Sequence, residues 1–430
     1  MNNASLALSQ SPPLSVPLRF FLTAPLFVIA CGVVLFWYGA EAFESRWHPA
    51  VLAATHFLTL GFLAMIMMGA LQQLTPVLMG AQISHPVLFS TVTHLLLTTG
   101  TLLLTAAWLW QQPTLFSFAG ILLGLAISLF IVVLLFSLSK AHSGYATVYA
   151  TRIALIAFAI TMTLGVYLVM GYSGSELTRL PGMTNLHMTW GLIGWVSLLL
   201  MGVAYQVVPM FQITPDYPKP MTRWFIIMMF IILLCWSTVQ SFYADKTGLL
   251  NFFSALLVMG LLSFAFVTLF LLSRRRRNIP DITLNFWRVS MASLLTVIIV
   301  WLLSLFDLHH RLEFFIGVAM ILGFAMSAVN GMLYKITPFL IWLHLNNYAQ
   351  GKDRTKFKIP NMKQVIPEQK SRLHFRTYNL MLLLSYLAVF WPEYFLRPAA
   401  LLLIISALVL INNIYFALRV YRYHSTKIIS

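Results

Sequence analysis

The chain has 430 residues, of which 60% are hydrophobic and 9% are charged, and its formal net charge is +16. A mean hydropathy of +0.85 excludes an ordinary soluble globular protein. The two cysteines, Cys31 and Cys235, both fall in apolar runs and have no metal-type spacing, so neither a disulfide framework nor a cysteine metal site is indicated.

Apolar runs of about 20 or more residues recur along the chain, and each is long enough to cross a bilayer as a helix. Residues 1–16 are polar and contain proline, and we expect a cytoplasmic tail there. The run after Arg19 is too long for a signal-peptide core. The rest, 17–430, is predicted to be one membrane domain with twelve spanning helices, over residues 17–43, 49–79, 86–110, 114–138, 151–172, 183–211, 222–243, 247–273, 285–306, 311–344, 377–394 and 398–420.

A sixteen-residue pattern appears three times, at the ends of the second, sixth and tenth predicted helices. It covers residues 61–76, 194–209 and 323–338, and each copy has Gly, a second Gly eight residues on, and Pro seven beyond that. The copies lie 133 and 129 residues apart. A fixed period indicates one structural unit used repeatedly. We therefore predict an all-α polytopic fold of three pseudo-symmetric four-helix arcs, with repeats near 17–140, 150–273 and 285–420, related by a pseudo-threefold axis along the membrane normal.

The positive charges are not spread evenly between the two sides of the predicted membrane. Most Lys and Arg residues fall on one side of the predicted helices, including the basic loop 345–376, while the opposite loops are short and acidic. This bias is typical of bacterial inner-membrane proteins and places both termini and the basic loop in the cytoplasm. We therefore expect the positive charge to attract anionic lipid headgroups rather than to bind a nucleic acid.

Polar residues at membrane depth are costly and are therefore candidates for function. His56 lies 20 residues before Pro76, and His187 lies 22 before Pro209. The two histidines thus hold related places in two repeats, which favours ligands over single hydrogen-bonded packing residues.

The third repeat differs. Its equivalent positions are near Ile316 and Val318, and His309 and His310 lie further out, followed by Arg311 and Glu313. His309 and His310 either cap a helix, bind a metal or contact a porphyrin propionate. Arg311 would neutralise the charge of such a propionate. His94 is a weaker mid-helix candidate. Five other histidines are expected at loops or membrane edges: His85, His142, His344, His374 and His424.

Within each copy, polar residues stand three and four positions after the second Gly. They are Gln72 and Gln73, Tyr205 and Gln206, and Tyr334 and Lys335. Either Lys335 extends to the headgroups, or the set lines a polar channel or a quinone headgroup site. The Met residues of the first copy, Met65, Met67, Met68 and Met79, are spread around the helix, so core or lipid contacts are favoured over copper(I) ligands.

These residues resemble the catalytic subunits of haem–copper oxidases, in particular the cbb-type oxidases and bacterial nitric oxide reductases. The family has twelve helices in three arcs, and its Gly-x-x-Tyr-Tyr-x-Val-Pro motif is similar to GVAYQVVP (202–209) and GMLYKITP (331–338) here. The run HMTWGLIGW (187–195) is similar to the family's His-x-His-x-Gly-x-x-Gly-Trp, with Thr189 in place of the second His. In the family that run lies on helix ten, whereas here it lies on the sixth predicted helix.

Several family ligands are absent. The seventh predicted helix has no His, and the helix-ten His-x-His pair is missing. The resemblance therefore implies a b-type haem without the usual copper centre, since a haem needs at most two imidazoles. The expected function is electron transfer with quinol, or nitric oxide or oxygen binding, and an enzyme of this kind would be an oxidoreductase. Two alternatives remain open: a transporter or assembly factor for copper or haem, and a structural membrane subunit with no cofactor.

Overall fold

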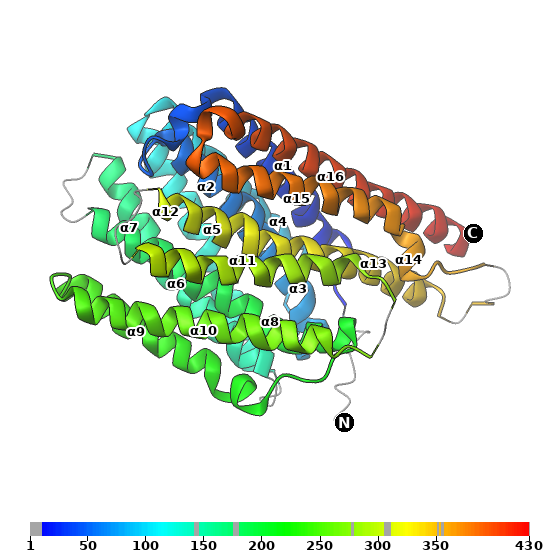
Figure 1. Cartoon of the computed structure of the whole chain (residues 1–430). Helices are drawn as coiled ribbons and strands as arrows, with labels where there is room; N and C mark the ends of the chain where they lie inside the picture. Colours follow the sequence, from blue (N-terminus) through cyan, green and yellow to red (C-terminus); the bar gives the residue numbers. More distant parts are fainter. Residues whose placement is uncertain are drawn as a thin grey trace. The chain divides into compact units, whose positions relative to one another are not determined.

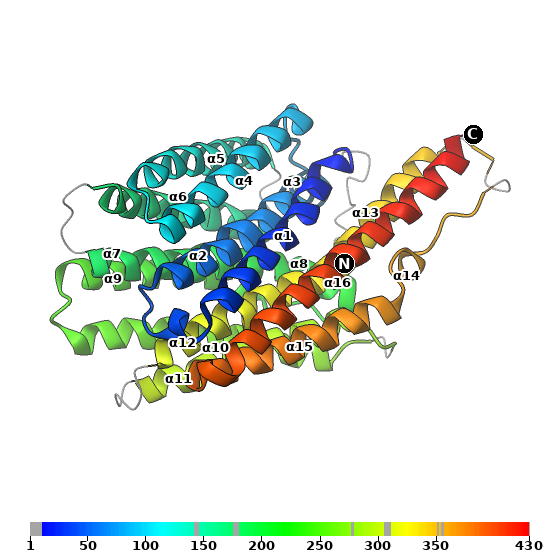
Figure 2. The ribbon, with the colours of Figure 1, turned by 90° about the horizontal axis from the view of Figure 1, so that it is seen from above.

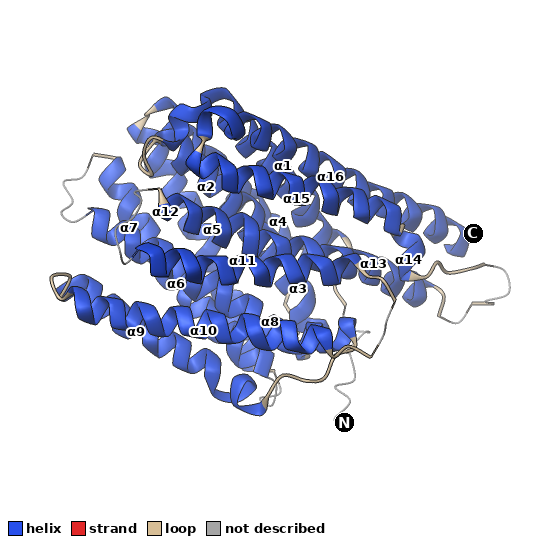
Figure 3. Cartoon of the chain, viewed as in Figure 1, coloured by secondary structure: helices blue, strands red, loops and turns tan. Residues whose placement is uncertain are grey.

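The computed structural model describes residues 11–141, 146–174, 180–276, 279–304, 311–350, 352–353 and 357–429. These residues form helices and connecting loops, and no strand occurs among them (Figure 3). Eleven of the helices are long and apolar enough to cross a membrane. The prediction of an all-α polytopic membrane protein is confirmed.

A further long helix, α15 (Glu368–Phe390), corresponds to the predicted span 377–394. It is 23 residues long and therefore long enough to cross. Its first half carries Lys370, Arg372 and Arg376, which lowers its mean hydropathy below that of the eleven others.

The described residues fall into two compact units. The first is drawn from 1–94, 280–287 and 326–430, and the second from 95–279 and 288–325. Helices α4 (Pro86–Trp110) and α11 (Ile282–Ser304) contribute residues to both (Figure 1).

The first unit contains the first repeat's opening helices and most of the third repeat. Its elements are α1 (Ser15–Tyr38), η2 (Gly39–Phe43), α2 (Pro49–Leu58), η3 (Thr59–Ala64), α3 (Met65–Met79), α13 (Ser327–Tyr348), α14 (Met362–Val365), α15 and α16 (Pro392–Ile429). Helix α16 packs along both α1 and α15 (Figure 2).

The second unit contains the whole second repeat. Its elements are α5 (Pro113–Ser139), α6 (Ala146–Tyr172), α7 (Leu180–Thr189), η4 (Trp190–Ser197), α8 (Leu198–Gln212), η5 (Met221–Phe225), α9 (Ile226–Phe242), α10 (Thr247–Ser273), α12 (Leu312–Val318) and η6 (Ala319–Met326), whose last residue belongs to the first unit.

The three motif copies share a local conformation. In each, a π-helical segment (η3, η4 or η6) ends five residues before the second Gly and continues directly into an α-helix. Each of those α-helices (α3, α8 and α13) contains the motif proline in its interior. π-Helical turns are rare in proteins, so their presence in all three copies supports the prediction of a repeated structural unit.

In each repeat, the second motif glycine allows the first helix to pack closely against the motif helix. A Cβ placed on Gly69 would lie 2.6 Å from Phe20 Cβ, one on Gly202 would lie 2.1 Å from Ala150 Cβ, and one on Gly331 would lie 2.8 Å from Phe286 Cβ. In the second and third copies a threonine on the same first helix donates a hydrogen bond to the glycine carbonyl, Thr147 to Gly202 and Thr283 to Gly331, each at 3.1 Å. The glycines therefore serve close helix packing, as in other membrane proteins.

Exposed apolar side chains form a stripe along α5. Phe118, Ile121, Leu125, Val132 and Phe136 are each more than half exposed and recur at helical spacing. In water such a stripe would be unfavourable, whereas in a bilayer it is the surface that contacts lipid. The lipid bilayer is thus the chain's environment.

Candidate functional site

A group of buried polar residues lies in the first unit, around α13. We define the α13 polar cluster as Asp281 at the start of α11, Ser327, Asn330, Tyr334 and Lys335 on α13, His374 and Tyr378 on α15, and Ser406 and Asn413 on α16. Their spacing explains the grouping. Ser327, Asn330 and Tyr334 stand at i, i+3 and i+7, and His374 and Tyr378 at i and i+4, so each set shares one helix face.

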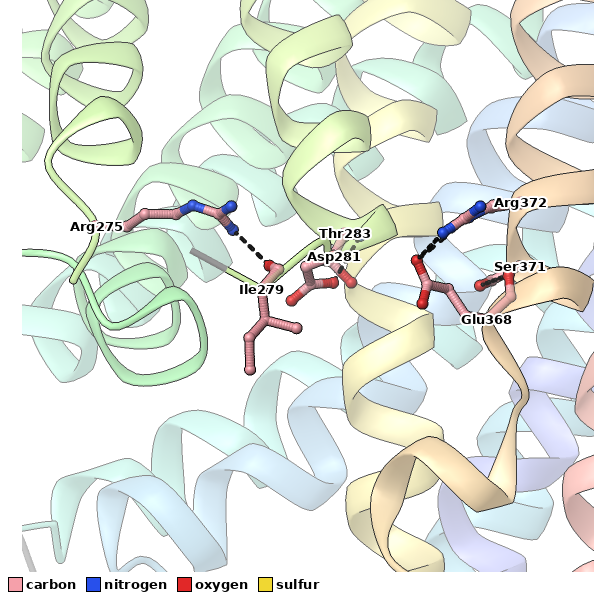
Figure 4. A network of polar contacts seen from close by, with 7 residues as sticks. All are labelled: Arg275, Ile279, Asp281, Thr283, Glu368, Ser371 and Arg372. Atoms are coloured by element: carbon pink, nitrogen blue, oxygen red, sulfur yellow. Dashed lines mark hydrogen bonds and ion pairs between the residues drawn. The ribbon is translucent and has the colours of Figure 1, made fainter. Parts of the chain in front are cut away.

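Lys335 forms an ion pair with Asp281. Its Nζ lies 2.5 Å from the Asp281 carboxylate, and the two side chains are 24% and 20% exposed. Oδ1 of Asp281 also accepts a hydrogen bond from the backbone N–H of Thr283, at 3.0 Å, within the first turn of α11 (Figure 4). The ammonium of Lys335 thus has a carboxylate partner within the first unit.

Tyr334 and Asn413 connect α13 to α16. Asn413 Nδ2 donates to the Tyr334 hydroxyl at 2.8 Å and to the backbone carbonyl of Lys370 at 3.1 Å. The ring of Tyr334 stacks on Phe286, with the centroids 6.2 Å apart. At the surface end of α15, Arg372 pairs with Glu368 at 2.7 Å (Figure 4).

His374 lies at the centre of this cluster and is only 1% exposed. Its ring contacts those of Phe286, Tyr334 and Tyr378, at centroid distances of 5.6, 5.7 and 6.0 Å. Within the described part of the chain, its Nδ1 has no hydrogen-bond partner. His374 was expected at a loop or a membrane edge; the structure places it within the first two turns of α15, with its side chain buried in the first unit.

Next to His374 is a cavity of about 10 Å³. Its polar lining comes from Asn330, His374, Tyr378 and Ser406. Tyr378 hydrogen-bonds to Asn330 and, at 3.5 Å, to Ser327. Oδ1 of Asn330 has no partner among the described residues.

The polar pairs of the first two motif copies have different surroundings. Gln73 Nε2 donates to Ser11 Oγ at 2.8 Å, and Gln72 Nε2 makes a long 3.4 Å contact with the Met68 carbonyl. In the second unit, Tyr205 packs edge-on against Tyr217, and Gln206 is half-buried. Of the residues of the predicted channel or quinone site, Gln73, Tyr334 and Lys335 belong to the first unit, and Tyr205 and Gln206 belong to the second. The site stays a prediction.

His56 and His187 have the same relation to their motif helices. Each stands three residues before a π-helical segment, η3 and η4 respectively. Nδ1 of His56 donates to the Leu52 carbonyl at 2.8 Å, and Nδ1 of His187 donates to the Thr161 carbonyl at 3.0 Å. The His187 ring also packs against Gly165, where an added Cβ would meet its Cε1 at 2.9 Å.

These bonds determine the tautomer. Because a carbonyl oxygen can only accept, the proton of each neutral imidazole is on Nδ1 and the lone pair is on Nε2. Iron-ligating histidines commonly have this arrangement, with Nδ1–H held by a carbonyl. The donor chemistry of both residues thus fits an axial haem ligand. His56 belongs to the first unit and His187 to the second.

The other predicted haem contacts are His309, His310 and Arg311. His309 and His310 lie outside the described residues. Arg311 directly precedes α12, and its carbonyl accepts from Phe315 N–H at 3.2 Å. Among the described residues, no three His, Cys, Asp or Glu side chains are grouped so as to hold a metal ion.

Sequence analysis missed most of the α13 polar cluster. Asn330, His374, Tyr378 and Asn413 were not singled out, although polar residues at i, i+3, i+4 and i+7 in apolar helices are a recognisable signal. No protein-family model matches the chain, and a search of curated proteins finds no significant match.

Proposed function

We propose that this chain is an integral membrane protein that binds b-type haem, with His56 in the first unit and His187 in the second as separate candidates for an axial ligand. The observation that carries the proposal is their shared setting: each precedes a π-helical segment by three residues and directs Nδ1–H to a backbone carbonyl. π-Helical turns are frequent at functional sites in membrane and soluble proteins. The motif resemblance to haem–copper oxidase catalytic subunits supports the same ligand class.

When bound, such a haem supplies one-electron transfer or binding of nitric oxide or oxygen. The chain's own residues hold and orient the imidazoles: the Leu52 carbonyl for His56, and the Thr161 carbonyl with Gly165 for His187. Arg311, and His309 or His310, are further candidates for contact with the haem or its propionates. The proposed location is the inner membrane of a bacterium, with both termini in the cytoplasm. The proposed electron donor is quinol.

The visible spectrum of the purified protein tests this proposal. Protein expressed with ample haem should show a Soret band, and reduction by dithionite should give the α and β bands of a b-type cytochrome. Copper without haem would favour a copper transporter or assembly factor. Protein with neither would overturn the proposal and leave a structural membrane subunit.

A further inference from the structure

The cavity beside His374 carries a second inference, which is independent of haem. Two residues that line this cavity, His374 and Asn330, each have a buried side-chain atom, Nδ1 and Oδ1 respectively, with no partner among the described residues. Both residues are 1% exposed. A buried polar group without a hydrogen-bond partner is unfavourable, so two such groups on residues that line one small cavity call for a shared partner.

The size of the cavity limits what that partner is. A volume of about 10 Å³ is close to the minimum that one water molecule needs. It excludes a quinone headgroup or any organic ligand. No carboxylate is among the lining residues, so the cavity offers a cation no countercharge.

We propose that this cavity binds one water molecule, which bridges Asn330 Oδ1 and His374 Nδ1. The water donates one hydrogen bond to the amide oxygen. With the imidazole it either donates to Nδ1 or accepts from Nδ1–H, so both tautomers of His374 are satisfied. Tyr378 and Ser406 provide two more polar neighbours, which matches the two to four partners of a buried water.

The surroundings of the proposed water are largely apolar, because the cavity's other lining residues are Val28, Phe62, Met326, Leu403, Ala407 and Leu410. Phe286, Tyr334 and Tyr378 surround the imidazole, and Phe286 is fully buried. A single enclosed water is therefore expected to be long-lived rather than in rapid exchange with the surface.

Radiolytic hydroxyl-radical footprinting tests this proposal on the full-length protein in detergent. X-ray pulses convert a bound water into a radical in place, so buried residues beside it are oxidised. Tyr378 and His374 should be oxidised several-fold more than Tyr334, which is also buried but bonds to Asn413 and does not line the cavity. In water enriched in oxygen-18, the label should appear in modified Tyr378.

Matched variants sharpen the result. Asn330→Leu removes the acceptor and fills the cavity with a side chain of similar size, and it should reduce oxidation of Tyr378 and His374 to the level of Tyr334. Asn413→Leu makes the same change outside the cavity and should leave both unchanged. If Asn330→Leu does not fold, Ser406→Val serves as the second cavity-lining variant. Equal oxidation of Tyr378, His374 and Tyr334 in the unaltered protein would mean that the cavity is dry, and undiminished oxidation in a folded cavity variant would equally overturn the proposal.

Discussion

The ammonium of Lys335 lies 2.5 Å from the carboxylate of Asp281, and both side chains are half-buried in the first unit. Lys335 stands four residues after the second motif glycine, a position that holds Gln73 and Gln206 in the other two copies. The third repeat thus has a cation where the others have an amide, and the start of α11 provides the anion that the cation needs. Unpaired charges at this depth would be strongly unfavourable.

If the ion pair stabilises the protein, substitutions of Asp281 and Lys335 should have non-additive effects on the unfolding free energy. Asp281→Asn keeps an oxygen that can accept from Thr283 N–H but leaves Lys335 without its counter-ion, and we expect a loss of about 2 kcal/mol in unfolding free energy. Lys335→Met in the Asp281→Asn background should restore part of that loss. Thermal unfolding in detergent measures both. A double variant less stable than Asp281→Asn alone would show that the charge pair is not what stabilises this contact.

Gly202 should not tolerate a side chain. Gly202→Ala would bring a methyl group within 2.1 Å of Ala150 Cβ, and overpacking of this kind costs about 1–3 kcal/mol. The double variant Gly202→Ala, Ala150→Gly should recover stability, because the methyl group then moves from one helix to the other. Gly124→Ala is the control, since the nearest atom to its added Cβ is Val166 Cγ2 at 3.7 Å. The melting temperature of Gly124→Ala should stay the same or rise, and an equal fall in Gly124→Ala and Gly202→Ala would contradict the packing explanation.

Replacement of His56 or His187 should alter the haem spectrum. We expect His56→Ala or His187→Ala to abolish or shift the Soret band, while the protein still inserts into the membrane. His344→Ala is the control, because His344 Nδ1 faces the Leu340 carbonyl at 2.9 Å, as His56 Nδ1 faces the Leu52 carbonyl. Its Nε2 also faces a carbonyl, that of Pro12 at 3.1 Å, and His344 has no equivalent place in the repeat. An unchanged band in both test variants, with loss on replacement of His309 or His310, would assign the ligand to the third repeat instead.

Helix α15 should cross the membrane despite its charged first half. A cysteine at Lys363, before α15, and one at Trp391, after it, should react with membrane-impermeant maleimide from opposite sides, the first from the cytoplasm. Both positions are exposed, and replacing Cys235 with Ser removes the less buried of the two native cysteines. If both cysteines were labelled from the same side, α15 would not cross the membrane. The chain would then have one crossing fewer, and its C-terminus would lie on the side opposite to the predicted one. Reporter fusions at both termini provide an independent check and should both report the cytoplasm.

The local features of each repeat were partly accessible from the sequence. The glycine and proline spacing identified the three motif helices, and the separation from His to Pro is 20 positions in one copy and 22 in another. The structure accounts for that difference, because η3 has 6 residues and η4 has 8. π-Helical turns could not be predicted, since no residue type specifies them and their hydrogen bonds differ from those of an α-helix by a single position.

The sequence by itself determined that the chain is an all-helical membrane protein with a repeated motif, because a bilayer requires long apolar segments with internally bonded backbones. Only the tertiary structure decided which polar groups become neighbours. Tyr334 and Asn413 are 79 residues apart, and their 2.8 Å bond depends on how α13 and α16 are rotated about their own axes. His374 is buried for the same reason, since hydropathy gives the depth of a residue but not the direction its side chain faces.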